Sequence, residues 1–520
     1  MDRKIQRALI SVTDKRGVVE FARGLAERGV EIIASGGTSR ALREAGISVT
    51  AIEDLTGFPE CMDGRIKTLH PKVHGGILAD RTKEGHLGQA ADLGIALIDL
   101  VAVNLYRFRE AASDPDLAEA EIVEQIDIGG PTLIRSAAKN HASVTVVVDP
   151  DEYQAVLTDM DGNGGAVPHD TRRRLASAAF HHTASYDAAI SSWFDSLEEP
   201  GEMPPSMITC YRRLRTLRYG ENPHQRAALY VEEPPAGSFH LFEQHQGKEL
   251  SFNNIQDMWA AFQLACDLGE RSCAVIKHMN PCGAAVCATE AESFVRARAT
   301  DPVSAFGSVV AVNGTVDEAF AEAVKEGFVE VIIARGFSGE ALAALGKKKN
   351  MRLITVPQEA WNPRPGSLSA REAGELLLVQ DRDEGFPELE ALECVTSRTP
   401  TPDEETAMRL AMKVVKHIRS NGIVICDSCG TIGVGAGQMS RVDSCRIAVE
   451  KAMAAGMQIE GASAGSDAFF PVPDGVEVLV EAGVGSIIQP GGSMRDQEVT
   501  DAAEKLGITM AVTGRRHFRH

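Results

Sequence analysis

The first part of the chain alternates short apolar runs with stretches of helical periodicity. The apolar runs are short enough for strands, and they span residues 8–12, 30–34, 100–105 and 144–148. Between the first two runs, residues 17–28 place apolar side chains on one face of a helix. Strands that are apolar throughout are typical of parallel sheets covered by helices. The pattern therefore predicts an α/β domain with a parallel sheet.

The rest of the chain repeats this alternation after a helical stretch over residues 171–197. Further strand candidates cover residues 274–276, 309–312, 331–334, 423–426 and 478–480. Residues 198–205, with three prolines, one glycine and three glutamates, have the composition of a linker. We therefore predict domains over residues 1–198 and 206–520, the second with a softer break near residues 347–369.

Composition and charge narrow the possible partners. The chain has 520 residues, too many for one core, and a formal net charge of −20. Such a surface repels nucleic acids and anionic membranes, and aromatic residues, at 5%, are too few for a base-stacking platform. Neither a signal-peptide core nor a run of membrane-spanning length is found, which predicts a cytoplasmic protein. In so acidic a chain, clusters of basic residues point to local anion sites.

The ten cysteines show no disulfide-like spacing, which indicates a reducing compartment. The one C-x-x-C pair, Cys426 and Cys429, has no second pair near it. A metal or redox role for this pair is therefore disfavoured.

A small glycine-rich segment is the first candidate site. Ser35, Gly36, Gly37 and Thr38 follow a predicted strand and open a predicted helix. There, free backbone N–H groups and the helix dipole favour a phosphate, and glycines allow close approach. A simple turn with a helix cap is the alternative.

A second basic cluster favours the phosphate hypothesis. Arg65, Lys67 and Thr68 lie within four residues, and Thr13 and Lys15 follow the first predicted strand. Three such loops would meet at the carboxyl edge of one sheet, where open α/β folds bind ligands.

Further polar residues could supply chemistry there. Asn104 and Tyr106 follow another predicted strand, and Asp127 precedes two glycines. Asp127 and Lys139 could form a proton-transfer pair, while Tyr106 could donate to a developing oxyanion.

The second predicted domain has its own candidate, Lys277-His278 before Asn280-Pro281-Cys282-Gly283. We expect a strand that delivers Lys277 and His278 onto a turn formed by the latter four residues. A lone histidine is more often structural, but a neighbouring lysine favours the neutral imidazole that can act as a base.

Three other segments of this domain predict structural roles. The glycine spacing of residues 433–438 does not match a dinucleotide-binding fingerprint, so we expect a loop beside a strand there. Residues 467–471 predict a strand end, and residues 483–493 a glycine-rich turn.

Taken in order, these motifs resemble one enzyme family along essentially the whole chain. They are Asp14-Lys15, Ser35–Thr38, the run Gly-Arg-Ile-Lys-Thr-Leu-His-Pro-Lys-Val-His-Gly-Gly-Ile-Leu from Gly64, and Glu-Gln-Ile-Asp-Ile-Gly-Gly-Pro-Thr-Leu-Ile-Arg from Glu124. The family is the bifunctional phosphoribosylaminoimidazolecarboxamide (AICAR) formyltransferase / IMP cyclohydrolase of purine biosynthesis. The resemblance implies a methylglyoxal-synthase-like first domain and a duplicated cytidine-deaminase-like α/β formyltransferase domain.

The resemblance also implies two consecutive reactions. A formyl group passes from 10-formyltetrahydrofolate to the 5-amino group of AICAR, and the product, FAICAR, closes to IMP with loss of water. For ring closure, Thr13, Lys15 and Ser35–Thr38 would hold the 5′-phosphate, and Arg65, Lys67, Thr68, Asn104 and Tyr106 would surround the base. Lys67 and Tyr106 would stabilise charge on the formyl oxygen, and Asp127 and Lys139 would handle the protons.

For formyl transfer, His278 would be the general base and Lys277 would stabilise developing charge. The resemblance assigns nucleotide contacts to Arg218, Tyr219, Gly307, Glu330, Asn421, Arg516 and Phe518. It assigns folate contacts to Arg441, Val442, Phe469, Asp474, Ser493 and Met494. Two positions depart from the family pattern: Arg107 stands where proline is usual, and Arg519 where histidine is common.

The resemblance further implies a homodimer with formyltransferase sites between subunits, and it leaves monovalent-cation binding open. We expect no zinc, because Pro281-Cys282 lacks the second cysteine of P-C-x-x-C and no H-x-E lies upstream. Two alternatives are weaker. A non-catalytic nucleotide sensor would not need Lys67, Asp127, Lys139, Lys277 and His278, and a phosphate-eliminating lyase would explain only the first domain.

Overall fold

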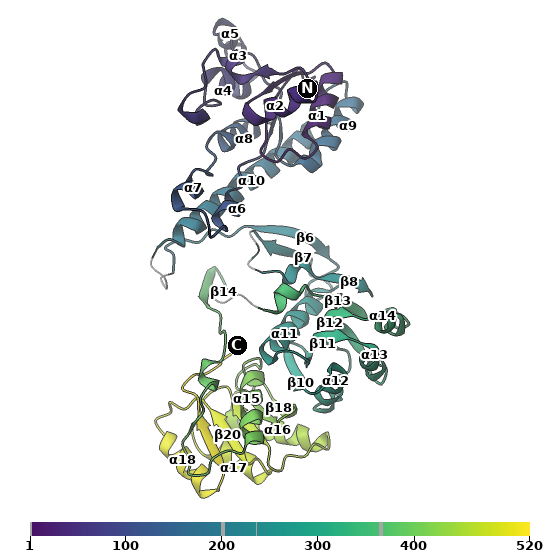
Figure 1. The fold of residues 1–520 in the computed structure, drawn as a ribbon, viewed down its shortest axis with the longest axis vertical. Helices are drawn as coiled ribbons and strands as arrows, with labels where there is room; N and C mark the ends of the chain where they lie inside the picture. The colour runs from purple at the N-terminus through teal and green to yellow at the C-terminus, as the bar shows by residue number, and fades with distance from the viewer. Residues whose placement is uncertain (1–2, 199–202, 234, 236, 363–367) are drawn as a thin grey trace. The chain divides into compact units, whose positions relative to one another are not determined.

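The computed structural model describes residues 3–198, 203–233, 235, 237–362 and 368–520 (Figure 1). The chain forms two compact units. Unit 1 comprises Met1–Arg212 with Glu232–Pro234, and unit 2 comprises Arg213–Val231 with Pro235–His520. Residues 199–202 of the predicted linker, and residues 363–367 of the predicted softer break, lie outside the described residues.

Unit 1 is built on a five-stranded sheet in the order β3-β2-β1-β4-β5, and every pair of neighbours is parallel. The strands are β1 (Arg7–Ser11), β2 (Glu31–Ala34), β3 (Thr50–Ala51), β4 (Leu100–Val103) and β5 (Thr145–Val147). The apolar residues of β1, β2, β4 and β5 are buried, because helices cover the sheet. The predicted parallel α/β domain is therefore confirmed.

The helices of unit 1 connect these strands. They are α1 (Val18–Glu27), α2 (Gly36–Glu44), α3 (Ile52–Thr56), α4 (Pro71–Leu78), α5 (Glu84–Asp92), α6 (Phe108–Ala112), α7 (Glu119–Val123), α8 (Gly129–Lys139), α9 (Tyr153–Gly162) and α10 (His169–Asp195), with short 3-10 turns at Met62–Gly64 and Pro150–Glu152. One prediction needs correction. The glycines of the Ser35–Thr38 segment do not form a separate loop, because α2 begins at Gly36.

Unit 2 contains the same chain of elements twice. The first half runs β8 (Glu243–Gln246), α11 (Phe252–Leu268), β9 (Ser272–Lys277), β10 (Asn280–Val286), α12 (Glu290–Ala299), β11 (Ser308–Val316), α13 (Glu318–Val324), β12 (Val329–Phe337), α14 (Gly339–Leu345) and β13 (Arg352–Thr355). The second half runs β16 (Glu393–Cys394), α15 (Pro402–Val415), β17 (Ile423–Cys426), β18 (Thr431–Gly435), α16 (Arg441–Ala454), β19 (Ser463–Ser466), α17 (Asp474–Glu481), β20 (Ser486–Gln489), α18 (Asp496–Lys505) and β21 (Thr509–Val512).

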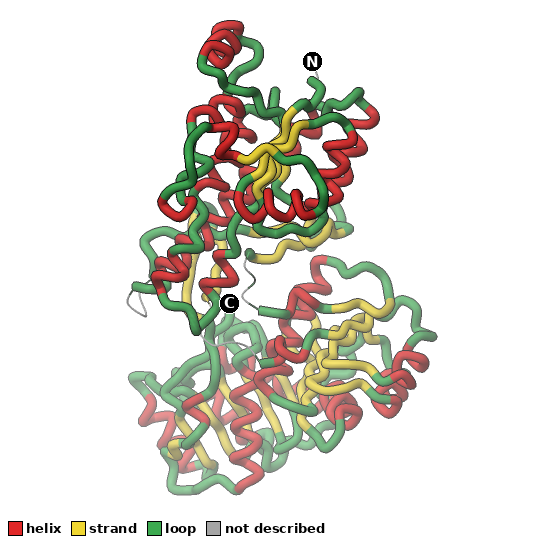
Figure 2. Tube along the Cα trace, turned by 45° about the horizontal axis from the view of Figure 1, so that its top comes forward, coloured by secondary structure: helices red, strands yellow, loops and turns green. Residues whose placement is uncertain are grey.

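The two halves also share one sheet topology. Their orders, β10-β9-β11-β12-β13-β8 and β18-β17-β19-β20-β21-β16, correspond strand for strand, and so do the parallel and antiparallel pairings. Helices flank both sheets in Figure 2. The expected duplication is therefore present in the topology.

A shared core joins the two halves. Met258 and Leu264 of α11 belong to the same hydrophobic cluster as Met408, Ala411 and Val415 of α15. Burying these side chains together explains why the two halves form one compact unit.

Smaller elements lie around the two sheets. A ribbon pairs β6 (Tyr211–Leu217) with β7 (Ala227–Glu232), and a hairpin of β14 (Leu368–Ala373) and β15 (Leu376–Asp381) separates the halves along the chain. Short 3-10 turns occur at Phe239–Leu241, Gln358–Trp361 and Pro387–Leu389. In the described part of the chain, no helix combines the length and apolar character needed to cross a membrane.

Four sequence predictions in unit 2 need correction. Residues 478–480 belong to helix α17, where Val476 and Leu479, one helical turn apart, face the core. Residues 483–493 contain strand β20 as well as a glycine-rich turn, and residues 433–438 begin inside β18. Asn280–Gly283 start strand β10, and the turn consists of His278 and Met279 instead.

Candidate active site

A cavity of about 820 Å³ lies at the carboxyl ends of β1, β2 and β4 in unit 1. Its lining includes most of the site residues predicted for this domain: Thr13, Lys15, Ser35, Gly37, Thr38, Arg65, Lys67, Thr68, Asn104, Tyr106 and Asp127. These residues come from segments far apart in the sequence. The parallel sheet brings them together, as the strand-end argument predicted.

One end of the cavity is suited to an anion. Helix α2 begins at Gly36 without a side-chain cap, so its first N–H groups point out of the helix. The ammonium of Lys67 lies 2.8 Å from the point where a Cβ on Gly36 would be, and that of Lys15 lies 3.8 Å from the same point on Gly37. Gly36 also has a positive φ of +48°, which favours glycine. Helix dipole and ammonium groups together favour a phosphate here.

Two predicted ligand contacts instead build the wall of the cavity. The Thr38 hydroxyl accepts from the Val12 N–H and donates to the Val12 carbonyl, both at 3.0 Å. The Asn104 amide oxygen accepts from Thr13 N–H at 2.6 Å and Asp14 N–H at 2.9 Å, and its nitrogen donates to the Asp14 carbonyl. These side chains hold the loop after β1, and the interpretation of Asn104, which also lines the cavity, as a contact to the base stays a prediction.

Asp127 and Tyr106 provide the groups that could move protons. Asp127 Oδ1 accepts from the Gly130 N–H at 2.8 Å. Burial raises the pKa of Asp127, and it outweighs the backbone N–H groups of Gly130 and Tyr106, which lower that pKa. Burial also raises the pKa of the Tyr106 phenol, and the nearby Asp127 charge adds to it. A carboxyl that holds its proton more tightly is a better general base.

The structure does not bring Lys139 to Asp127. Lys139 is the last residue of α8, and Asp127 precedes its first residue. At 1.5 Å per residue the helix separates its two ends by about 15 Å. Lys139 is exposed and is absent from the cavity lining. The predicted proton-transfer pair is therefore not formed within unit 1.

Some supporting residues escaped the sequence analysis. The Tyr186 hydroxyl of α10 accepts from the Asp127 N–H at 2.9 Å and donates to the Gln125 carbonyl at 2.9 Å. Glu124 forms an ion pair with Arg65. Gly130 was within the motif, and a Cβ there would lie 2.6 Å from Asp127 Oδ2. The paired glycines after Asp127 were the one local signal for this close approach, since Tyr186 lies far along the chain.

In unit 2, Lys277 ends strand β9 and His278 begins the turn to β10. The Lys277 ammonium donates to the carbonyls of Phe306, at 3.2 Å, and Gly307, at 2.9 Å. Lys277 and Gly307, predicted separately, therefore lie together. The exposed His278 projects from the same turn.

The turn has an unusual backbone. His278 and Met279 have φ values of 51° and 64°, in the left-handed region that non-glycine residues seldom occupy. Asp257 of α11, which the sequence analysis missed, accepts from the Met279 N–H at 2.7 Å, and the Asn280 amide donates to the His278 carbonyl at 3.2 Å. Such conformations cluster at functional sites, where surrounding contacts hold them.

Other predicted residues of unit 2 are engaged with protein partners. Arg441 is buried, and it bonds to Asp467, to Ser466 Oγ at 2.7 Å and to Asn421 Oδ1 at 2.7 Å. Its guanidinium is thus held by protein partners, and the predicted folate contact through Arg441 stays a prediction. Glu330 accepts from Arg352 at 2.9 Å.

The remaining predicted residues of unit 2 vary in exposure. Phe469, Met494 and Phe518 are exposed, whereas Val442 is half-buried and Asp474 begins α17. The Arg218 guanidinium lies over the Tyr219 ring, and that of Arg516 lies over the Phe518 ring. No group of three or more His, Cys, Asp or Glu that could hold a metal occurs among the described residues.

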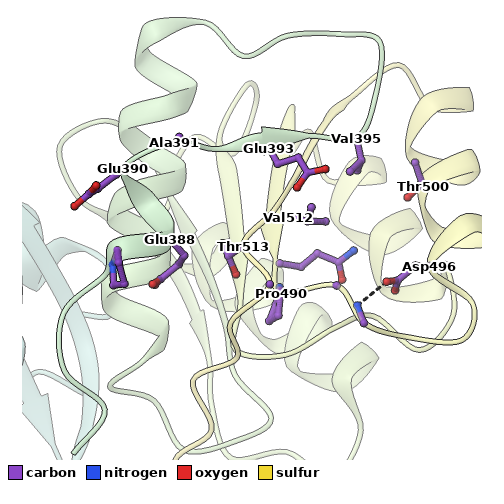
Figure 3. Close-up of a pocket in the computed structure, with 15 residues that line it drawn as sticks. Glu388, Glu390, Ala391, Glu393, Val395, Pro490, Asp496, Thr500, Val512 and Thr513 are labelled. Atoms are coloured by element: carbon purple, nitrogen blue, oxygen red, sulfur yellow. Dashed lines mark hydrogen bonds between the residues drawn. The ribbon is translucent and has the colours of Figure 1, made fainter.

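A second cavity, of about 510 Å³, lies in the second half of unit 2 (Figure 3). Glu388, Glu390, Glu393 and Asp496 are among its lining residues, and its described lining includes no lysine or arginine. Asp496 accepts from the N–H groups of Gly492 and Ser493, the first drawn as a dashed line in Figure 3. The Asp496 carboxylate already accepts from these N–H groups, and the other acidic residues of the lining repel a phosphate, so this cavity is not a candidate anion site.

Comparison with known proteins decides the family. Residues 137–451, more than half of the chain, match the family model described as AICARFT/IMPCHase bienzyme, and residues 17–132 match the MGS-like domain. The chain belongs to the AICARFT/IMPCHase bienzyme family. It is accordingly a bifunctional enzyme of purine biosynthesis, an AICAR formyltransferase and an IMP cyclohydrolase. The sequence resemblance and the methylglyoxal-synthase-like first domain are thereby confirmed.

Individual relatives agree along the full length. Proteins of Bacillus cytotoxicus and Bacillus mycoides, both named "Bifunctional purine biosynthesis protein PurH", are each 48% identical over 517 residues. These alignments cover 99% of this chain and 100% of each relative. A solved structure named "Crystal structure of ForH" is 41% identical, with a TM-score of 0.34, and is similar over 37% of this chain and 100% of its own.

Proposed function

We propose that the two reactions of this bienzyme take place at separate sites. Ring closure of FAICAR would occupy the cavity of unit 1, within a cyclohydrolase domain of residues 1–198. Formyl transfer would take place around Lys277 and His278, within residues 206–520. The observation that carries this division is that the unit 1 cavity joins the uncapped start of α2 and the ammonium groups beside it to the half-buried carboxyl of Asp127.

In the unit 1 cavity, the 5′-phosphate would lie at the start of α2 between the ammonium groups of Lys15 and Lys67. This places Lys67 on the phosphate side and leaves Tyr106 as the donor to the formyl oxygen. The carboxamide nitrogen attacks the formyl carbon, and Asp127 takes one proton from that nitrogen. The formyl oxygen receives this proton and the one on the formamide nitrogen, and it leaves as water while a C=N bond forms in the ring. Since both reacting groups belong to one molecule, positioning and proton transfer suffice.

In unit 2, the co-substrate would be 10-formyltetrahydrofolate. The 5-amino nitrogen of AICAR attacks the formyl carbon while His278 takes its proton. The bond from that carbon to N10 of the folate then breaks, and N10 receives the proton. Lys277, held beside Gly307, would stabilise the negative charge on the formyl oxygen. Arg218, Tyr219, Gly307, Glu330, Asn421, Arg516 and Phe518 remain the proposed nucleotide site, and Val442, Phe469, Asp474, Ser493 and Met494 the proposed folate site.

We also propose that the chain forms a homodimer through the β14–β15 hairpin. The hairpin pairs only with itself among the described strands. Its residues Leu376, Leu377 and Leu378 are 64%, 53% and 60% exposed. A run of exposed leucines on an unpaired strand edge is typical of an interaction surface.

The ten free cysteines support a reducing, cytoplasmic location.

Supplying each substrate separately tests the division of labour. The purified protein should convert FAICAR to IMP without folate, and should convert AICAR to IMP only when 10-formyltetrahydrofolate is added. Liquid chromatography of the nucleotides measures both conversions. IMP formation from AICAR without a formyl donor, or no ring closure of FAICAR by folded protein, would contradict the proposal.

A further inference from the structure

The last six residues of the chain alternate between the protein and the solvent. His517 is 1% exposed, and its neighbours Arg515 and Arg519 are half-buried. Arg516, Phe518 and His520 are exposed. An extended chain places successive side chains on opposite sides, so one side of this tail anchors it and the other side is presented.

His517 is the centre of the anchored side. Its Nδ1 lies 2.6 Å from Asp383 Oδ2, and its Nε2 lies 3.1 Å from Glu388 Oε1. Each ring nitrogen lies at hydrogen-bond distance from a carboxylate oxygen, so the His517 ring bridges two acidic residues.

Arg515 strengthens the same junction. It donates to Asp383 Oδ1 at 2.8 Å, and its other terminal nitrogen lies 3.7 Å from Glu388 Oε2. Burial opposes ionisation of Asp383, but the hydrogen bond and charge of His517 outweigh it and lower the pKa of that carboxyl. We call Arg515, His517, Asp383 and Glu388 the tail clamp.

The clamp ties the tail to a second segment of unit 2. Asp383 and Glu388 follow the β14–β15 hairpin, and Glu388 also lines the cavity of Figure 3. Further tail contacts go to loops beside β17 and β19, where the His517 N–H donates to the Asp467 carbonyl and the Ser420 N–H donates to the Arg519 carbonyl, both at 2.9 Å. Arg371 of β14 also donates to the His520 carbonyl at 2.7 Å. Among the described residues, His517 is thus bonded to both segments at once.

We propose that His517 is a positioning residue for formyl transfer, which holds the tail so that Arg516 and Phe518 are presented together to the nucleotide. The inference rests on the proposed function, which assigns these two residues to the AICAR site. The Arg516 guanidinium lies 4.8 Å from the centre of the Phe518 ring. A cation paired with an aromatic ring suits a nucleoside monophosphate, with the cation for its phosphate and the ring face for its base.

The test compares His517→Leu with wild type in the full-length protein. Leucine fills the space but removes the histidine contacts to Asp383 and Glu388 and leaves only Arg515 of the clamp beside these carboxylates, which costs stability locally. The Michaelis constant for AICAR should rise about tenfold or more, equivalent to about 1.4 kcal/mol of lost binding. At saturating AICAR, kcat should stay within about twofold, because the tail contributes binding and not the reacting groups. Ring closure of FAICAR should be unchanged.

A second readout does not depend on activity. Carboxypeptidase should remove the terminal residues of His517→Leu about tenfold faster or more, because the freed tail opens more often. His245→Leu is the matched control, since His245 bonds to Thr355 at the β8–β13 edge and touches neither clamp segment. If His517→Leu does not fold, Glu388→Gln removes one charge with little change in size and should give the same changes at smaller amplitude.

The outcomes separate the clamp from the proposed function. Unchanged tail digestion and an unchanged Michaelis constant in folded variants would overturn the clamp. Faster digestion of the tail with an unchanged Michaelis constant for AICAR would show that His517 anchors the tail without affecting nucleotide binding. This outcome would also overturn the proposal. Arg516→Ala distinguishes the remaining case: if it leaves AICAR binding intact, the assignment of Arg516 fails whatever the clamp does.

Discussion

At the residue scale, the surroundings of a carboxyl decide its chemistry. Burial raises the pKa of Asp127, which accepts backbone hydrogen bonds but has no ion pair within the described chain. Burial acts in the same direction on Asp267, yet a hydrogen bond from His417 and the charges of His417 and Lys416 outweigh it and lower its pKa to about 2. A cation at hydrogen-bond distance thus separates a candidate proton acceptor from a structural anion.

Asp127→Asn tests the first of these roles. The amide oxygen can still accept from Gly130, but the side chain cannot take a proton, so FAICAR ring closure should fall about a hundredfold or more. The raised pKa in the folded state means that the carboxyl costs stability as pH rises through that pKa. The variant should therefore unfold at an equal or higher temperature than wild type at pH 7, and the difference should shrink as pH falls below the raised pKa of Asp127.

Ring-closure rates and calorimetry measure these two effects. Asp92→Asn, at the exposed end of α5, is the matched control and should change neither. A destabilised Asp127→Asn protein at pH 7 would show that the carboxylate serves the fold and not the reaction.

At the element scale, packing between helices joins the two halves of unit 2. Asp267 near the end of α11 bonds to His417 at 2.7 Å and to Lys416 at 2.9 Å, just beyond α15. The same two helices share the apolar cluster around Met258 and Met408. Burial of the apolar cluster stabilises the contact between the halves but is not directional, whereas the ionic contacts link particular points on the two halves.

The lowered pKa of Asp267 predicts a stability change in acid. A carboxyl with a depressed folded pKa contributes stability that is present above its ordinary value, near 3.8, and is lost as pH falls through about 2. A shift of this size corresponds to about 2 kcal/mol. The difference in unfolding free energy between wild type and Asp267→Asn should therefore shrink by about 2 kcal/mol between pH 4 and pH 2. Denaturant titrations at both pH values check this; a constant difference would contradict it.

The β14–β15 hairpin predicts the assembly state. Leu376 and Leu378 lie on one side of β15, since strand residues two apart share a side. Replacing both with serine should weaken dimerisation about a hundredfold or more, because each leucine buried in an interface contributes about 1.5–3 kcal/mol. Sedimentation velocity over a range of concentrations measures the change. A double variant at the exposed Leu93 and Leu197 of unit 1 is the control, and equal behaviour of the two variants would exclude the hairpin.

At the scale of the whole molecule, the two candidate sites are built on different units with separate cores. The unit 1 cavity is lined by residues 11–133, and the Lys277–His278 turn belongs to unit 2. Among the described residues, the lining of the unit 1 cavity comes from unit 1 alone. The two activities should accordingly respond independently to substitution.

His278→Ala checks this independence. Formyl transfer should fall about a hundredfold or more with loss of the base, while FAICAR ring closure should stay within about twofold of wild type. Asp127→Asn should show the reverse pattern, so the two variants control for each other. Loss of both reactions in folded His278→Ala would contradict separate sites.

Much of the fold and of the first site could be predicted from local patterns. Apolar runs such as residues 423–426 coincide with strand β17, and the helix predicted over residues 171–197 is α10 within two residues at each end. The strand predicted over residues 478–480 was wrong because β-branched residues in a short apolar run also fit a buried helix. The predicted site residues of unit 1 line one cavity because residues at the ends of parallel strands meet at one edge of the sheet.

By itself, the sequence determined the family, the parallel sheet of unit 1 and the segments that line its cavity, since each depends on residues close together in the chain. Only the tertiary structure decided how the polar atoms are used. It removed Lys139 from Asp127, turned Asn104 and Arg441 toward protein partners, and placed His517 between Asp383 and Glu388. These partners lie as far as 134 residues apart, and no local pattern specifies such a pair. Periodicity determines which residues are buried, but the packing of distant segments determines what each buried polar group meets.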